Sequence, residues 1–283
     1  MAIRNILVPI FRGVDFHAQL DAALQLGRKE PVHLGALFIR PDPVTLTALM
    51  PDRLIAAGIT IEMIEGEGRD AETKAKAAFE AWRLANDVPL GNADLRVCCA
   101  SWHERVAPVE TAIIDAGRLS DLIVISHPDS FETVTQRAFD AAVFETGRPA
   151  LILPKGDTGD LLDHVLIAWN SSIEATRAVA GAMPMLRQAK HVSIFTAPTH
   201  TDEAIRDLYL GEQLAWHGIR SHYLSPNLDA HSVGAALLEA VHTERATMIV
   251  MGAYTHSRVR EMLLGGVTRH ILRHAAVPVL MMH

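Results

Sequence analysis

The stretch that decides the fold runs from Met248 to Met282 and reads MIVMGAYTHSRVREMLLGGVTRHILRHAAVPVLMM. An apolar run of strand length is followed by a polar loop, a glycine pair, a segment with helix periodicity and a second apolar run. This order is typical of a parallel sheet with crossover helices. The loop after such a strand exposes backbone N–H groups at the carboxyl edge of the sheet. Glycine permits close approach and a helix N-terminus adds partial positive charge, so the stretch favours an anion such as a nucleotide phosphate.

The same alternation of apolar runs and helix-period segments extends along the whole chain, with five strand candidates in each half. Continuous apolar runs predict strands that are buried on both faces of a parallel sheet. The predicted strands are Asn5–Ile10, His33–Ile39, Asp94–Ala100, Leu122–Ser126, Pro149–Pro154, His164–Trp169, His191–Ala197, Ile219–Leu224, Met248–Ala253 and Pro278–Met282.

The two halves are also similar in local sequence. NILVPI near the start matches HVLIAW in the second half, and TGRPALILP, from Thr146, matches AAVPVLMMH, from Ala275. Repeats at this spacing indicate duplicated domains rather than a solenoid. PKGDTGDLLD, between the copies, is rich in turn residues. We therefore predict two domains, residues 1–157 and 158–283.

The first copy contains the irregular segments. Three prolines in Pro41–Pro51 argue against a long helix there. Ile61–Arg69 carries two glycines among charged residues and is predicted to be a loop before a helix over Ala71–Asn86.

Composition excludes several classes of protein. The 283 residues are 49% hydrophobic and 21% charged, the balance of a globular protein with a sizeable core. The net charge of −7 argues against a nucleic-acid partner, which requires a positive surface. The sequence starts directly with a strand-like run and contains no apolar stretch of bilayer-spanning length. We expect a cytoplasmic protein with no membrane partner.

At the Met248–Met282 stretch the chain resembles the universal stress protein family. Members that bind ATP share a motif of Gly, two residues, Gly, nine residues, Gly, then Ser or Thr. Gly252 and Gly265 fill the first and third positions, whereas Thr255 replaces the second glycine and Gly266 replaces the hydroxyl residue. The spacing is intact, but β-branched Thr255 cannot adopt positive φ cheaply and Gly266 supplies no side-chain oxygen.

Other positions follow from the same resemblance. Asn170 stands where the family often has Asp, which removes a charge that would help to hold Mg²⁺. Ser172 matches the serine two residues later, Thr196 would face the base, and Val267 would follow the phosphate loop. The resemblance thus implies a nucleotide site formed by Ala168, Asn170, Ser172, Thr196, Met251, Gly252, Thr255, Gly265, Gly266 and Val267.

For the chain as a whole, the resemblance implies an α/β fold of two tandem doubly wound five-stranded parallel-sheet domains. This fold is adenine nucleotide α-hydrolase-like, with strand order 3-2-1-4-5. The implied function is a stress-response module that binds ATP or another adenine nucleotide, with Mg²⁺ as the ion that would accompany it. Self-association through the last strands would pair Pro149–Pro154 with Pro278–Met282 as an intramolecular pseudo-dimer and cover two sheet edges. In the first copy, Phe11 and Ser126 replace the acid and the first glycine, which predicts a degenerate site.

Simpler interpretations remain for each feature. The glycine motif could be a tight strand-to-helix turn without a ligand, and Asn170 and Ser172 could only cap a helix. His270 and His274 share a helix face without a third ligand at convincing spacing, so no metal site is predicted. The adjacent Cys98 and Cys99 are predicted to fill a buried strand.

Three functions therefore remain open. The first is adenine nucleotide binding by the second domain, and the second is a scaffold or a binder of a small apolar ligand. The third is a slow ATP hydrolase. The sequence has neither a Gly-x-Ser-x-Gly elbow nor a Walker loop, and no acid–base pair can be nominated. We therefore assign no catalytic residue and do not expect an efficient enzyme.

Overall fold

The computed structural model describes residues 2–28, 30–44, 58–91, 97–128, 134–156, 158–196, 201–224, 232–253 and 266–283, with residues 47, 52 and 56. The chain divides into two compact units. The N-terminal unit comprises Arg4–Val124 and Pro128–Thr146. The C-terminal unit comprises Gly147–His283 with the short segments 2–3 and 125–127.

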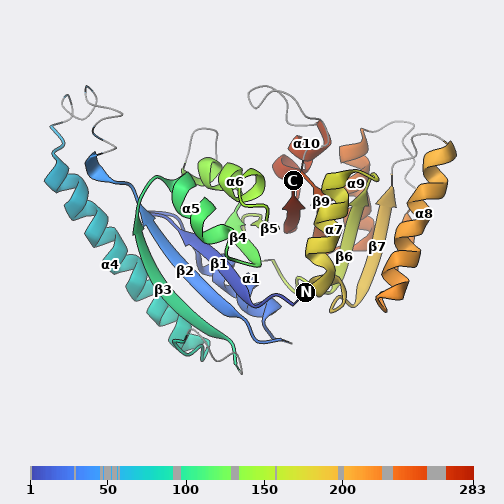
Figure 1. The fold of residues 1–283 in the computed structure, drawn as a ribbon, viewed down its shortest axis with the longest axis horizontal. Coiled ribbons are helices and arrows are strands. Elements are labelled where there is room, and N and C mark those ends of the chain that lie inside the picture. The colour runs from blue at the N-terminus through green and yellow to red at the C-terminus, as the bar shows by residue number, and fades with distance from the viewer. Residues whose placement is uncertain are drawn as a thin grey trace. The chain divides into compact units, whose positions relative to one another are not determined.

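The N-terminal unit is built on a parallel sheet in which the neighbouring strands are β3, β2, β1 and β4. Right-handed crossovers place α1 and α4 on one face of this sheet and α5 and α6 on the other, where α5 packs against α6 (Figure 1). The strands are β1 (Asn5–Ile10), β2 (His33–Arg40), β3 (Cys99–Val106) and β4 (Leu122–Ser126), and the helices are α1 (His17–Leu26), α4 (Ile61–Ala85), α5 (Val109–Gly117) and α6 (Val134–Phe144).

The C-terminal unit repeats this plan. Its strands are neighbours in the order β8, β7, β6, β9 and β10, all parallel. The same handedness places α7 and α8 on one face and α9 and α10 on the other. The strands are β5 (Ala150–Leu153), β6 (His164–Trp169), β7 (His191–Thr196), β8 (His222–Leu224), β9 (Met248–Gly252) and β10 (Val279–Met282), and the helices are α7 (Ile173–Leu186), α8 (Thr201–Trp216), α9 (Val233–Glu244) and α10 (Gly266–His274).

Strand order confirms the predicted fold class. The orders β3-β2-β1-β4-β5 and β8-β7-β6-β9-β10 are both 3-2-1-4-5. β5 is the last strand of the first copy, but it lies in the C-terminal unit because it pairs antiparallel with β10, with Leu151 opposite Leu280. This pairing covers edges that two separate sheets would expose.

The core is mostly aliphatic, as the aromatic content of 5% predicts, and the central strands are buried on both faces. Ile6 and Val8 of β1 and Leu166 and Ile167 of β6 have no exposed surface. Such burial at every consecutive position explains why these strands could be recognised as continuous apolar runs.

The third strand lies later in the sequence than predicted. It was expected over Asp94–Ala100, but β3 begins at Cys99 and continues to Val106, with its last four residues exposed. β3 pairs with β2 along its length on one side, whereas on the other side the described residues form an isolated bridge between Ala100 and Leu90. An outer strand of this kind does not need a continuous apolar run, so its polar residues resemble a loop in the sequence.

The predicted loop over Ile61–Arg69 is also wrong, because α4 begins at Ile61 and runs for 25 residues. Thr60 caps the helix, its hydroxyl accepting a hydrogen bond from the Met63 N–H at 3.3 Å. Two interior glycines cost about 1 kcal/mol each relative to alanine, which the length and packing of the helix offset. Within the described parts of the chain, no helix has both the length and the apolar character needed to cross a membrane.

Candidate functional site at the carboxyl edge of the C-terminal sheet

The carboxyl ends of β6, β7 and β9 lie side by side. Ala168 is opposite Met251, and Trp169 is opposite Thr196. Gly252 ends β9. The helix that follows a parallel strand starts near the carboxyl end of that strand and runs back toward its amino end. α7 and α10, which follow β6 and β9, therefore both begin at this edge. The structure therefore brings the predicted strand-end residues together with two helix N-termini.

The turn after β6 is held by its own side chains. Asn170 Oδ1 accepts a hydrogen bond from the Ser172 N–H at 3.3 Å, and Ser172 Oγ accepts one from the Ala175 N–H at 3.1 Å. Ser171, between them, has a φ of 56°. Both predicted site residues thus serve as the capping structure of α7, the simpler interpretation left open by the sequence. The side chain of Asn170 is nevertheless exposed at the edge.

Gly252 has a packing role that its place in the motif does not reveal. A Cβ at this position would lie 2.6 Å from the Ala175 nitrogen and 2.7 Å from the Glu174 carbonyl carbon. Both atoms belong to the backbone in the first turn of α7, so they cannot move aside cheaply. Glycine is therefore required here for the contact between β9 and α7, whatever else the position does.

Gly266 differs from Gly252 in this respect. It is the first residue of α10, and a Cβ added to it would meet no atom of the described residues within 4 Å. Val267 follows it on the helix and is half-buried. Thr255 and Gly265 lie outside the described residues. The predicted anion cradle between Met251 and Val267 is thus described only at its two ends.

Two further side chains near this edge were not predicted from the sequence. The indole Nε1 of Trp169 and the Nε of Arg269 are buried, and neither has a hydrogen-bond partner among the residues that the structure describes. Trp169 ends β6, and Arg269 lies one turn into α10. The sequence offered two signals that could have identified them: an aromatic residue at the end of a predicted strand and a cationic residue early in a predicted helix.

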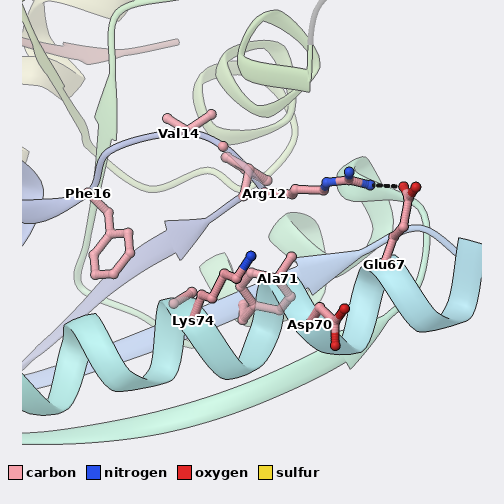
Figure 2. A pocket seen from close by; sticks show the side chains of 11 residues that line it. Arg12, Val14, Phe16, Glu67, Asp70, Ala71 and Lys74 are labelled. Atoms are coloured by element: carbon pink, nitrogen blue, oxygen red, sulfur yellow. Dashed lines mark hydrogen bonds and ion pairs between the residues drawn. The ribbon is translucent and has the colours of Figure 1, made fainter.

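In the N-terminal unit, the corresponding edge has a different character. Phe11 follows β1 and is buried, whereas its counterpart Asn170 is exposed. Ser126 ends β4, where the second copy has Gly252. A cavity of about 470 Å³ lies at this edge between the loop after β1 and helix α4 (Figure 2). The degenerate motif gave no indication of this cavity.

A histidine cluster lies at the opposite, amino edge of the C-terminal sheet. His164 Nδ1 donates to the Glu244 carbonyl at 2.8 Å, so its Nε2 must accept from the Ser193 hydroxyl, 2.5 Å away. Ser193 in turn accepts from His222 Nε2 at 3.2 Å, and the same nitrogen lies 3.1 Å from Glu244 Oε2. Burial lowers the pKa of His164 and outweighs the carbonyl and carboxylate of Glu244, which raise it, while His191 and His222 make smaller lowering contributions.

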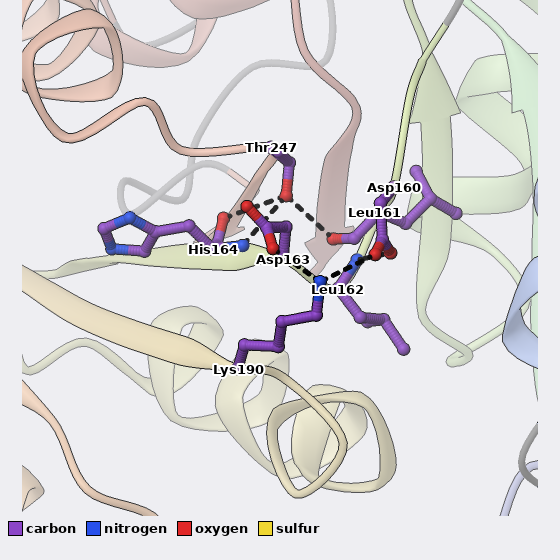
Figure 3. A network of polar contacts seen from close by, with 7 residues as sticks. All are labelled: Asp160, Leu161, Leu162, Asp163, His164, Lys190 and Thr247. Atoms are coloured by element: carbon purple, nitrogen blue, oxygen red, sulfur yellow. Dashed lines mark hydrogen bonds and ion pairs between the residues drawn. The ribbon is translucent and has the colours of Figure 1, made fainter.

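The segment that leads into the second copy is tied to this same edge (Figure 3). Lys190 Nζ lies 2.8 Å from Asp163 Oδ1 and 3.3 Å from Asp160 Oδ2. The Thr247 hydroxyl lies 3.2 Å from both the Leu161 and His164 carbonyl oxygens and 3.1 Å from the His164 nitrogen. These contacts fix the start of β6, at the opposite end of the strands from the carboxyl-edge residues.

Metal ligation finds no support in the described ranges, where no group of three or more His, Cys, Asp or Glu residues is placed to hold an ion. The imidazoles of His270 and His274 lie 4.6 Å apart on α10. Gly234 of α9 approaches the His270 ring, since a Cβ on that glycine would lie 3.0 Å from it. His270 therefore forms part of the contact between the two helices.

Comparisons with known proteins agree with the fold. Residues 226–283 match the universal stress protein family. The crystal structure of a universal stress protein from Archaeoglobus fulgidus DSM 4304 has a TM-score of 0.72 at 20% identity and covers 98% of this chain and 95% of that one. A proposed universal stress protein from Pseudomonas aeruginosa UCBPP-PA14 gives 0.56 at 18% identity, with coverage of 99% and 93%. No curated protein sequence matches the chain.

Proposed function

We propose, from the premise that the chain is a tandem member of the universal stress protein family, that its second copy binds an adenine nucleotide. Family membership is carried by the match over residues 226–283, and the two-copy fold extends it along the chain. The proposed site is the carboxyl edge of the C-terminal sheet. In this proposal the protein is a cytoplasmic stress-response module that reports the nucleotide through protein contacts.

The convergence of strand ends and helix N-termini carries the proposal. Ala168, Thr196 and Met251 lie on neighbouring strands at one edge, and α7 and α10 both begin there. The N-terminus of each helix presents backbone N–H groups and a partial positive charge toward that edge. This is the arrangement in which doubly wound sheets bind phosphate-bearing ligands.

The charge of α10 supports an anion at its N-terminus. α10 has no acidic residue in its first turn to balance the partial positive charge of the helix N-terminus, a feature that it shares with α1, α6 and α9. Instead Arg269 lies one turn into the helix with its Nε buried and unpartnered among the described residues. A phosphate would supply the negative charge that the sequence does not.

The residues at this edge are better suited to bind a nucleotide than to hold the Mg²⁺ that would accompany it. Asn170 carries no charge, and its Oδ1 is already an acceptor for the Ser172 N–H. Gly266 offers no oxygen to a phosphate or an ion. We therefore expect binding to depend on backbone amides and to depend only weakly on Mg²⁺, whose ligands are oxygen atoms.

The two copies would also form the pseudo-dimer that the family resemblance implies. β5 and β10 pair antiparallel through Leu151 and Leu280 within the C-terminal unit. Family members that consist of one copy can use the last strand in the same way between chains. We propose that this intramolecular pairing takes the place of a dimer contact.

Titration calorimetry with ATP on the full chain tests the nucleotide site through Gly266. Gly266→Asp adds a carboxylate at the start of α10, and Gly266→Asn adds a neutral group of the same size. Among the described residues, no atom lies within 4 Å of a Cβ at this position, so neither side chain clashes with them. The aspartate should weaken ATP binding about tenfold or more through repulsion of the phosphates, and the asparagine should not. Equal affinity in both variants, or no ATP binding by the wild type, would contradict the proposal.

A further inference from the structure

The cavity of the N-terminal unit has an apolar floor. Phe11, Phe16 and Phe38 line it and are all buried. Ala71 and Ala75 of α4 form the opposite wall with small side chains that leave the space open. A volume of about 470 Å³ lies in the range of sites that enclose small organic molecules.

The charged side chains that line the cavity differ in whether they already have an ion-pair partner. Arg12 Nη1 lies 2.7 Å from Glu67 Oε2, so this pair is internally neutral. In Figure 2, Lys74 extends from α4 toward the loop after β1, and the Asp70 carboxylate is turned away from its ammonium. No hydrogen bond or ion pair of Lys74 occurs within the described ranges of the chain. Among the lining residues, Lys74 is therefore the cation available to a ligand.

The loop that faces Lys74 is already in a defined conformation. Gly13 has a φ of 72°, which glycine adopts without strain, and the Val14 N–H donates to the Phe11 carbonyl at 3.2 Å. The ring of Phe16 stacks on that of His17, with centroids 5.2 Å apart. A formed loop lowers the conformational cost of binding.

We propose that this cavity binds a small carboxylate with an aromatic or branched aliphatic body. The carboxylate would accept hydrogen bonds from Lys74 Nζ, and the body would lie on Phe11 and Phe16, which keep a small exposed fraction above the fully buried Phe38. A nucleoside triphosphate does not suit the cavity, because Phe11 and Ser126 stand where the family motif has an acidic residue and a glycine that lets the backbone approach a phosphate. The inference is independent of the nucleotide site in the second copy.

Calorimetry with 3-phenylpropanoate, 4-methylpentanoate and 3-phenylpropanamide on the full chain tests the proposal. Lys74→Met keeps the length of the side chain and removes its charge. It should weaken binding of the carboxylates about five- to tenfold and leave the amide unaffected. Lys74→Arg should retain most of the affinity. Lys76→Met, on the same helix but outside the cavity lining, is the matched control and should bind as the wild type does.

A second pair of variants tests the space rather than the charge. Ala71→Leu fills the cavity from a helix position and should abolish binding, while Ala77→Leu, at an exposed position of α4, should have no effect. Leucine and alanine are both good helix formers, so α4 should fold in either variant.

Three results would overturn the proposal. One is the absence of saturable carboxylate binding at about 5 mM, a weak limit for ligands of this size. Another is equal affinity for carboxylate and amide, or for wild type and Lys74→Met. The third is displacement of the carboxylate by ATP in the Gly266→Asp variant, which would place the nucleotide in this cavity instead.

Discussion

Gly252 lies so close to the first turn of α7 that a methyl group on it would be 2.6 Å from the backbone nitrogen of Ala175. This short distance shows that Gly252 and Gly266, the two described glycines of the motif, have different structural roles. The glycine at the end of β9 allows a strand to pack against a helix, whereas a Cβ on Gly266 at the start of α10 would contact none of the residues that the structure describes. The two positions should therefore respond differently to the same substitution.

Gly252→Ala should lower the free energy of unfolding by about 1–3 kcal/mol, because the added methyl must displace the backbone of α7. Gly266→Ala is the matched control and should change it by less than about 1 kcal/mol, with stabilisation the expected direction at a helical position. Urea unfolding of both variants followed by circular dichroism measures the difference. Equal midpoints would show that the β9–α7 contact relaxes, contrary to the packing argument.

Capping by Ser172 gives a second prediction. Ser172→Ala removes the oxygen that accepts from the Ala175 N–H and should cost about 1 kcal/mol of stability. Ser172→Asp keeps a capping oxygen, so the protein should remain as stable as the wild type. If a nucleotide phosphate approaches this turn, the aspartate should nevertheless weaken ATP binding. A stable Ser172→Asp protein with unchanged ATP affinity would limit Ser172 to capping.

The parts of the fold that the sequence predicts well are those buried on both faces. β1, β4 and β6 begin and end at the predicted residues because each contains an uninterrupted apolar run of strand length. β3 was misplaced because its outer half, through Glu104 and Arg105, is exposed and carries no apolar pattern. The start of α4 was missed because two local signals in the sequence disagreed. Thr60 is a good capping residue, but the glycines after it outweighed that signal.

The candidate site was only partly predictable. Residues at strand ends, such as Ala168 and Thr196, could be placed because parallel strands end at a common edge. The packing role of Gly252 could not, since it depends on the distance between β9 and a helix that begins almost 80 residues earlier. The cavity beside Lys74 was also hidden, because the helix that forms its wall was predicted to begin only at Ala71.

The adjacent cysteines should differ in reactivity. Burial raises the pKa of the Cys99 thiol, with a smaller contribution from Cys98. Cys98 is half-buried and lies before the strand, its Sγ 3.1 Å from the Gly27 carbonyl oxygen. Iodoacetamide near pH 8 should alkylate Cys98 at least about tenfold faster than Cys99, since the thiolate is the reactive form. Peptide mass spectrometry over a time course, with Cys98→Ser as the control, measures both rates. Comparable rates would contradict the assignment of Cys99 as a buried strand residue.

The histidine cluster around His164 should make stability depend on pH. The pKa of His164 is lowered in the folded protein, so folding favours the neutral ring. Its contribution to stability is therefore complete above the unfolded pKa of about 6.5 and is lost as the pH falls toward the folded value. Protonation would also require Ser193 to accept from His164 and His222 at once, with Glu244 as the one carboxylate among the hydrogen-bonded groups.

His164→Gln removes the titrating ring and should reduce the loss of stability between about pH 7 and 5, by up to about 1.4 kcal/mol per pH unit where the ring titrates. His242→Gln, at an exposed position on α9, should leave the pH dependence as in the wild type. Part of the dependence should persist in both variants, because burial also lowers the pKa of His33 in the other unit. Urea unfolding at a series of pH values gives the slopes. A His164→Gln protein with the wild-type slope would mean that the ring is not held neutral by its neighbours. In that case the Ser193 hydroxyl need not donate to it in the folded state.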